Sequence, residues 1–366
     1  MRMVSLIVRF LLLTAPVLLS VSCHRSSPPQ PPAPPAKTTE TKVTFLAVGD
    51  IMLSRGVAEV IDRAKDPLLP FRHLEAVLKS TDFNFGNLET PLSGDDKILG
   101  HDLIFNAHTK DMAGLSQFNF KVLNLANNHA FDQHLAGAQF TRNYLKDHGI
   151  ASLGTGDNLD EAWQPKIITV NDLRIGFIGA SYASVNDTGA TRNDYVARIE
   201  DVDRLGRAID ELKSEADFIL ITMHAGTQYE AKPNPASPRD KKQIDFAHAA
   251  IDRGADLVIG AHPHWIQNLE VYGGKYIFYS LGNFIFDQHE PLTKEGLVLR
   301  ITLQGKRTIS SAPATDTRQA RLTTRLEKIE CLPIIIEDNS TPRLASEAEA
   351  SRILTRMSLP RKLPSP

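Results

Sequence analysis

The sequence predicts an α/β protein in which helices cover a central sheet, and three observations support this fold class. Short runs rich in β-branched and aromatic residues alternate with longer segments whose apolar residues recur at helical spacing. The runs are almost continuously apolar, as is typical of strands that are buried on both faces. The chain has 366 residues, of which 42% are hydrophobic and 23% charged, which is enough for a sizeable core.

The N-terminal segment predicts export rather than a part of the fold. Residues 1–23 combine basic residues with a short apolar stretch, as in a secretory signal peptide. They end in "LLSVSC", which resembles the lipobox of bacterial lipoproteins and makes Cys23 the expected lipidation site, although Ser20 stands where Leu is usual. The alternatives are an ordinary signal peptide or an uncleaved anchor. We expect an exported, membrane-anchored lipoprotein on the periplasmic or extracellular face.

A Pro-rich linker is expected over residues 24–41, followed by one folded domain over 42–360. The only cysteine besides Cys23 is Cys331. With Cys23 lipidated, no intrachain disulfide can form, so the domain is expected to fold without one.

Within the domain, strands and helices are expected to alternate. The patterns predict helices over 133–149 and 196–216, and Ser346 is expected to cap a terminal helix that ends before Pro360. The segment 303–324 is polar and is expected to be a surface hairpin or a loop. The predicted strands are 43–49, 82–87, 121–126, 174–180, 217–223, 255–261, 275–283 and 297–303, and residues 325–344 are again strand-like.

Polar residues stand where six of the predicted strands end. Because ligands bind beyond the carboxyl ends of parallel strands, these side chains should converge on one edge. Carboxylates, amides and imidazoles without a thiol suit Mn, Fe, Zn or Mg, as one or two divalent ions. Each cluster alone could be a turn or a helix cap. The set is Asp50, Asn87, Glu89, Asn127, Asn128, His129, Asp132, His224, His262, His264, Asn283 and Asp287.

At these positions the sequence resembles a known family. The segments "AVGDIMLSRGV", "FNFGNLETPLS", "LNLANNHAFD", "HAGTQY", "GAHPHWIQ" and "YSLGNFIFDQ" are similar to those of the CapA family of poly-γ-glutamate capsule synthesis proteins. The resemblance spans about Val43 to Gln288. It implies a four-layer α/β/β/α sandwich of the calcineurin-like metallophosphoesterase type, with a dinuclear metal site.

The resemblance also implies a role for each residue. His129 would be the general acid that protonates a leaving oxygen, Asp132 would orient it, and Asn127 would only form the turn. We expect Asn283 and Asp287 to contact the substrate. The implied metal ligands are Asp50 and His264 for the first ion, Asn87 or Glu89 between the ions, and Asn128, His224 and His262 for the second ion.

The chain departs from the expected pattern in two places. Metallophosphoesterases commonly have "DxH" in the first motif, whereas this chain has Met52 at the third position, so the first ion would lose a ligand. Family members often have "HWGxEY" where this chain has "HAGTQY", so that Ala225 replaces an aromatic residue and Gln228 a carboxylate. We therefore expect a substrate preference of its own.

Three functional hypotheses follow. The first is a metal-dependent hydrolase that acts on an anionic polymer such as poly-γ-glutamate or on a phosphoester. The second is a non-hydrolytic, metal-dependent polymer-binding component of a membrane synthesis or export complex, with synthase or export subunits as partners. The third is a scaffold whose site has decayed. A formal net charge of −2 without a basic cluster gives no indication of nucleic-acid binding.

Overall fold

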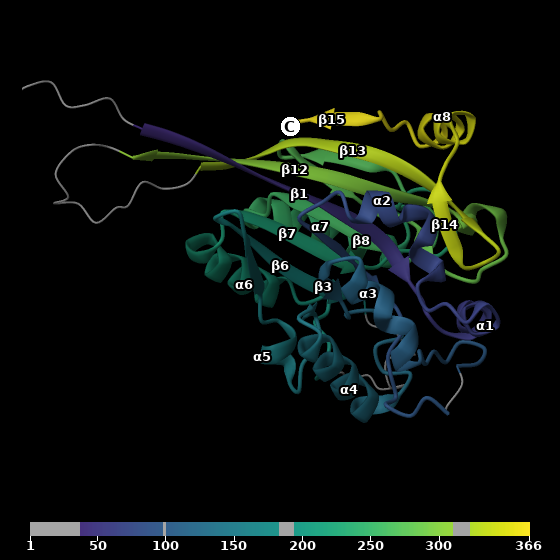
Figure 1. Ribbon diagram of the computed structural model, residues 1–366. Helices are drawn as coiled ribbons and strands as arrows, with labels where there is room; N and C mark the ends of the chain where they lie inside the picture. Colours follow the sequence, from purple (N-terminus) through teal and green to yellow (C-terminus); the bar gives the residue numbers. More distant parts are fainter. Residues whose placement is uncertain (1–36, 98–99, 183–193, 310–322) are drawn as a thin grey trace, which may run out of the picture.

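The structure, a computed structural model, describes residues 37–97, 100–182, 194–309 and 323–366 (Figure 1). The expected signal peptide, Cys23 and most of the expected linker lie outside these ranges. None of the helices in the described part of the chain combines the length and the apolar character needed to cross a bilayer.

Two sheets form the centre of the fold, and both contain parallel strands. In the described residues the larger sheet has nine strands, with β1, β2, β3 and β4 parallel to one another. Its members are β1 (Lys37–Ile51), β2 (Phe83–Leu88), β3 (Phe120–Asn124), β4 (Ala151–Leu153), β11 (Asn283–Ile285), β12 (Glu295–Ile309), β13 (Thr323–Glu337), β14 (Thr341–Leu344) and β15 (Lys362–Pro364).

The second sheet has six strands in the order β5-β6-β7-β8-β10-β9, of which β6, β7, β8 and β10 are parallel. These strands are β5 (Lys166–Val170), β6 (Leu173–Ser181), β7 (Phe218–His224), β8 (Leu257–Ala261), β9 (Leu269–Tyr272) and β10 (Lys275–Phe278). The expected strand 275–283 is therefore interrupted, because its two ends, β10 and β11, belong to different sheets. The antiparallel edge strand β5 was not expected.

The inner faces of the two sheets pack against each other through aromatic side chains. Phe45 of β1 stacks on Phe83 of β2 at 4.7 Å between ring centroids, and Phe177 of β6 meets Phe83 and Phe85 from the opposite sheet at 6.3 and 5.7 Å. These residues are fully buried. Close packing of large apolar side chains thus holds the two sheets face to face.

Helices cover the two outer faces, which completes the four layers. The outer face of the larger sheet packs against α1, η1, α3 and α4, and that of the smaller sheet against α6 and α7. The described helices are α1 (Arg55–Ala64), η1 (Leu69–Leu74), α2 (Glu75–Leu78), η2 (Thr109–Met112), α3 (Ala113–Gln117), α4 (His134–Asp147), α5 (Leu159–Ala162), α6 (Val202–Glu215), α7 (Pro238–Arg253), η3 (Pro291–Lys294) and α8 (Glu347–Arg356).

One of the expected helices begins later than the pattern predicts, and another begins where it was expected. The pattern over 196–216 includes Ile199, but α6 starts at Val202 because the Asp201 side chain accepts the backbone N–H of Arg204 and caps the helix there. The terminal helix is confirmed: Ser346 and Glu349 form a complete capping box at the start of α8.

The edges of the domain lie outside the expected limits of 42–360. β1 begins at Lys37, within the range expected as linker, and its residues 37–42 pair with Gln304–Ile309 of β12. At the other end, β15 pairs with β13 beyond residue 360. β12 and β13 pair antiparallel up to residues 306 and 323, so the polar segment 303–324 starts and ends as a hairpin. Together with the start of β1, these strands form a ribbon that projects from the body (Figure 1).

Candidate metal centre

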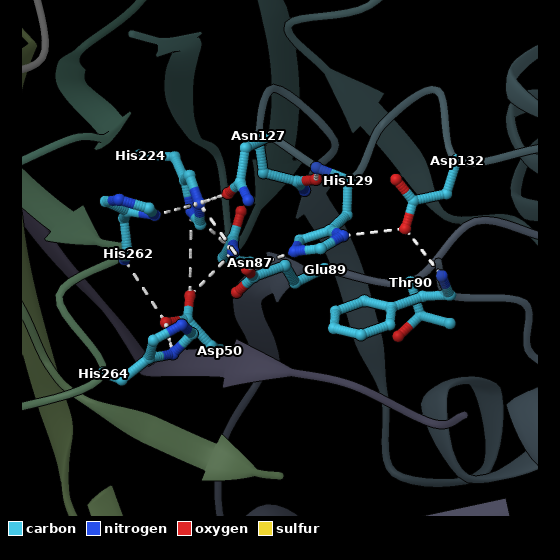
Figure 2. A network of polar contacts seen from close by, with 12 residues as sticks. Asp50, Asn87, Glu89, Thr90, Asn127, His129, Asp132, His224, His262 and His264 are labelled. Atoms are coloured by element: carbon cyan, nitrogen blue, oxygen red, sulfur yellow. Dashed lines mark hydrogen bonds and ion pairs between the residues drawn. The ribbon is translucent and has the colours of Figure 1, made fainter. Parts of the chain in front are cut away.

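The polar strand ends converge, as expected, at the carboxyl edge of the two sheets (Figure 2). Asp50 lies near the end of β1, and His224 is the last residue of β7. Gly49 allows β1 to approach the neighbouring chain closely: a Cβ atom there would lie 1.8 Å from the carbonyl oxygen of Gly282. The same oxygen accepts the N–H of Asp50 at 3.1 Å, which fixes the backbone that carries this carboxylate.

Two groups of three side chains could each hold a metal ion. One consists of Asp50, Glu89 and His264, and the other of Glu89, His224 and His262. In each group the ligand atoms lie within 4.8 Å of one another, and all five residues are buried. Glu89 is common to both groups, so it has the position that the resemblance implies for the group between two ions.

The environment of Glu89 fits a bound cation. Both of its carboxylate oxygens are buried and have no hydrogen-bond partner among the described residues. Burial raises the pKa of this carboxyl well above its usual range, and the negative charge of Asp50 raises it further. A buried carboxylate without partners is costly unless a positive charge compensates it, so the donor set is consistent with divalent metal binding.

His224 lies at the centre of the second group. Its Nε2 atom is 2.6 Å from Oδ1 of Asn128, 3.0 Å from Nδ1 of His262 and 3.7 Å from Oε1 of Glu89. Burial lowers the pKa of His224 and of His262 well below the usual value, and the neighbouring histidines lower it further. The imidazoles are therefore neutral near pH 7, as metal ligands must be.

The first group has fewer donors. The Sδ atom of Met52 accepts the backbone N–H of Ser54 at 3.1 Å, and Met52 packs in the apolar cluster beneath the outer helices. Nδ1 of His264 lies 2.9 Å from Oδ1 of Asn283 and 3.5 Å from Oδ2 of Asp50. Two oxygen acceptors at Nδ1 assign its proton there, which leaves Nε2 of His264 for a ligand.

Asn283 differs from its expected role as a substrate contact. It is 1% exposed, and its Nδ2 donates to the backbone oxygen of Thr293 and to Oε1 of Gln288. All of these contacts are internal, so Asn283 orients His264 rather than facing the cleft.

Asn87 also differs from the expectation of an oxygen ligand. Its Nδ2 donates to Oδ1 of Asp50 at 2.8 Å and lies 3.1 Å from Nδ1 of His224, whereas its Oδ1 accepts from Nδ2 of Asn124 at 2.9 Å. Asn87 thus presents a donor to the site and supports two ligands. In the sequence, Asn124 shows only as an amide at the end of the apolar run of β3, so nothing there indicated this role.

The loop after β3 separates the roles of its polar residues. Asn127 donates to the backbone oxygen of Leu88 and accepts the N–H of His129, as a turn residue does. Nδ1 of His129 lies 2.7 Å from Oδ2 of Asp132, and Nε2 of His129 lies 3.7 Å from Oε1 of Glu89. His129 therefore points toward both candidate metal groups and is held from behind by Asp132.

Phe105 is a second support of His129 that the sequence did not reveal. The two rings stack with centroids 3.8 Å apart and planes inclined by 17°. Oδ2 of Asp132 also accepts the N–H of Phe105 at 2.6 Å, so one carboxylate holds both members of the stack. Phe105 lies in a loop without periodicity, which explains why no pattern indicated it.

A cleft of about 680 Å³ opens beside the ligands. Asp287 lines it, as expected for a substrate contact, but its carboxylate is already engaged: Oδ1 pairs with Arg55, and Oδ2 accepts the N–H of Gly56 at 3.0 Å. Gln228 also faces the cleft, whereas Ala225 is buried behind it. Other lining residues include Asn128, His129, Tyr182, Tyr229, Arg239 and His264.

The backbone at the end of β8 is strained. His262 and His264 have φ values of +99° and +61°, a region that residues other than glycine rarely occupy. Such conformations are maintained where a site needs them. Here they place the imidazoles of His262 and His264 in different candidate metal groups, the arrangement that the resemblance implies.

Comparison with known proteins identifies relatives of the chain. Residues 44–288 match the family described as bacterial capsule synthesis protein PGA_cap. The capsule biosynthesis protein CapA of Bacillus anthracis is 32% identical over 271 residues, which cover 72% of this chain and 64% of that protein. The PGA biosynthesis protein CapA of Bacillus subtilis is 31% identical over 261 residues, covering 70% of this chain and 67% of the other.

A solved structure supports the fold. It belongs to a Staphylococcus aureus protein described as a 5'-nucleotidase, in complex with α-ketoglutarate. The match has a TM-score of 0.50 and 17% identity, and it covers 87% of this chain and 58% of the other. The four-layer α/β/β/α sandwich of metallophosphoesterase type is thus confirmed as the fold class.

Proposed function

The chain belongs to the family of bacterial capsule synthesis proteins, and from this premise we propose that it is a metal-dependent hydrolase of a polyanionic envelope polymer. The matched region covers about two thirds of the length of the Bacillus relatives, at 64% and 67%. Poly-γ-glutamate is the polymer that the family resemblance indicates. A phosphoester substrate is the alternative that the fold supports.

The observation that carries the proposal is Glu89. Its carboxylate is fully buried, neither of its oxygens has a hydrogen-bond partner among the described residues, and it belongs to two groups of ligand atoms, so it would suit bound cations. His224, His262 and Asn128 would hold one ion, and Asp50 and His264 the other. Bound divalent cations lower the pKa of water and neutralise charge that develops on a phosphoryl or carbonyl oxygen.

The remaining chemistry belongs to the chain itself. With Nδ1–H donated to Asp132, Nε2 is the nitrogen of His129 that faces the site, and in the imidazolium form it bears the proton to be transferred. Nε2 could then protonate a leaving oxygen or nitrogen. Phe105 and Asp132 prevent the ring from turning away, which keeps that nitrogen aimed at the substrate.

The test uses the full chain, purified and stripped of metal, then assayed with and without Mn²⁺ on phosphodiesters and on γ-linked glutamate oligomers. We expect cleavage of one class that requires Mn²⁺. The control is His129→Gln, which should retain metal and lose turnover. If the metal-loaded chain cleaves neither class, the hydrolase proposal is wrong.

The sulfur of Met52 favours a second candidate function. Because it is committed to the Ser54 N–H, it adds nothing to the first metal group. A site with one weak metal position could bind a polyanion without cleaving it, as a component of a synthesis or export complex. Metal-dependent binding of poly-γ-glutamate without turnover, together with co-purification of membrane subunits, would support this candidate.

We also propose that the chain is exported and lipid-anchored through Cys23. The support is the order of residues 1–23 and the Pro-rich segment that follows. Mass spectrometry of the N-terminal peptide from cell membranes tests this proposal. A Cys23→Ser variant should move to the soluble fraction, whereas an unlipidated Cys23 in the native chain would contradict the proposal.

A further inference from the structure

Arg239 lines the cleft, and the ring of Tyr182 lies between it and the candidate metal ligand His262. Cζ of Arg239 lies 4.9 Å from the ring centroid of Tyr182, and the Tyr182 ring lies 4.7 Å from that of His262. A guanidinium that stacks on an aromatic face keeps its N–H edge free for a planar anion.

Arg55, on another part of the cleft, shows what a purely structural arginine looks like here. Its Cζ lies 4.5 Å from the ring centroid of Phe105, in a comparable stack. Arg55, however, pairs with Asp287 and donates to the backbone oxygen of Asp102. Its charge is compensated within the protein, so it serves to hold Phe105 in place.

Arg239 has no such compensation. The side chain is exposed, and within the described ranges no carboxylate lies at ion-pair distance from it. A positive charge that stacks on a ring and has no counter-ion among the described residues, in a cleft beside candidate metal ligands, favours an anionic ligand.

The backbone at Arg239 is held firmly. The neighbouring Asp240 is buried and accepts the N–H and the Oγ1–H of Thr227, both at 2.7 Å, as well as the N–H of Asn234 at 2.9 Å. One turn later, Gln243 donates to the backbone oxygen of Ala225. The first turn of α7 is thereby tied to the loop after β7, which carries the cleft residues Gln228 and Tyr229, so Arg239 is pre-positioned.

We propose that Arg239 is a specificity residue that binds an anionic group of the substrate next to the reacting bond. The inference rests on the proposed function and narrows it: the substrate carries a carboxylate or a phosphate beyond the group at the metal centre. Arginine suits either group, because its planar fork donates two parallel hydrogen bonds to two oxygens.

The experiment measures binding of a γ-linked glutamate tetramer and of inorganic phosphate to the Mn²⁺-loaded full chain by calorimetry, at low and high salt. Arg239→Ala should weaken one probe by about tenfold at low salt and reduce the salt dependence of its binding. Arg239→Lys should recover part of the loss. The control is Arg63→Ala, which removes another exposed positive charge, in the last turn of α1.

The two probes distinguish the sources of the anion. A loss confined to the tetramer assigns a carboxylate, and a loss for phosphate assigns a phosphoryl group. If the unmodified chain binds a probe and Arg239→Ala binds it equally well, the inference falls and the proposed function stands. If the unmodified chain binds neither probe, the inference falls, and the cleavage assay alone decides the proposed function.

Discussion

Two buried carboxylates in this protein resemble each other and yet differ in what surrounds them. Glu89 and Asp111 are both fully buried, and neither has a hydrogen-bond partner for its two oxygens among the described residues. Burial raises the pKa of each, that of Asp111 to about 7. Judged by burial and pKa alone, both would be candidate functional groups.

The difference lies in the neighbours. Glu89 shares its surroundings with Asp50 and three histidines, from which two ligand groups arise. Asp111 has one imidazole nearby, with Nδ1 of His108 at 3.6 Å, and belongs to no candidate metal group in the described part of the chain. A perturbed carboxylate therefore indicates a metal centre only where further donors converge on it.

The largest expected effect is a loss of metal affinity when Glu89 is changed, but not when Asp111 is changed. Glu89→Gln should lower the affinity for Mn²⁺ at least roughly a hundredfold, because the ligand common to both groups loses its charge. The matched variant Asp111→Asn should bind metal like the unmodified chain. Metal analysis after equilibrium dialysis measures both, and equal metal content in the two variants would refute the comparison.

A smaller effect, on turnover, is expected for Asp132, which contacts His129 but belongs to neither candidate metal group. Asp132→Asn should reduce turnover by about a hundredfold, because the tautomer and orientation of His129 are no longer imposed. The metal content should not change, since Asp132 belongs to neither ligand group. If turnover is unaffected while the Glu89 variant is inactive, His129 is not the proton donor.

The next effect is a pH-dependent change in thermal stability when Asp111 is substituted. Folding raises the pKa of Asp111 from 3.8 to about 7. The free energy of unfolding therefore decreases as the pH rises through that interval, because the unfolded chain loses this proton more readily. Asp111→Asn should therefore raise Tm by a few degrees at pH 8 and by less at pH 5, as followed by calorimetry of the metal-free protein. A lower Tm at pH 8 would mean that the ionised carboxylate pairs favourably with His108.

The smallest effect is expected at Met52. Met52→Leu conserves volume and removes only the sulfur that accepts the Ser54 N–H, so stability should fall by less than about 1.5 kcal/mol. Metal content should remain unchanged. A loss of bound metal in this variant would show that the thioether is a ligand after all.

The sequence was most informative where a side chain directly follows a buried strand. Asp50 and His224 lie in the last residues of β1 and β7, His262 directly follows β8, and strand geometry brings the three to one edge. The choice between Asn87 and Glu89 could not be made in advance, because it depends on Asn124 from the neighbouring strand, which turns the amide nitrogen of Asn87 toward the site.

Phe105 and Arg239, which stack on other side chains, could not be predicted from the sequence for a different reason. Phe105 lies in a loop, and Arg239 is one of several exposed residues in the first turn of α7. Neither position carries a periodic signal, and their partners are distant in sequence. The extension of β1 to Lys37 was missed because its residues are polar, and only pairing with β12 makes them a strand.

The extension of β1 to Lys37 sets the distance between the start of that strand and the candidate metal centre. β1 runs from Lys37 at the tip of the projecting ribbon to Asp50 in the centre, and at the rise of an extended strand this spans roughly 40 Å. A tether attached before Lys37 would thus join β1 at the end opposite to the candidate metal groups. If the chain is lipid-anchored as proposed, β1 would separate the cleft from the lipid surface.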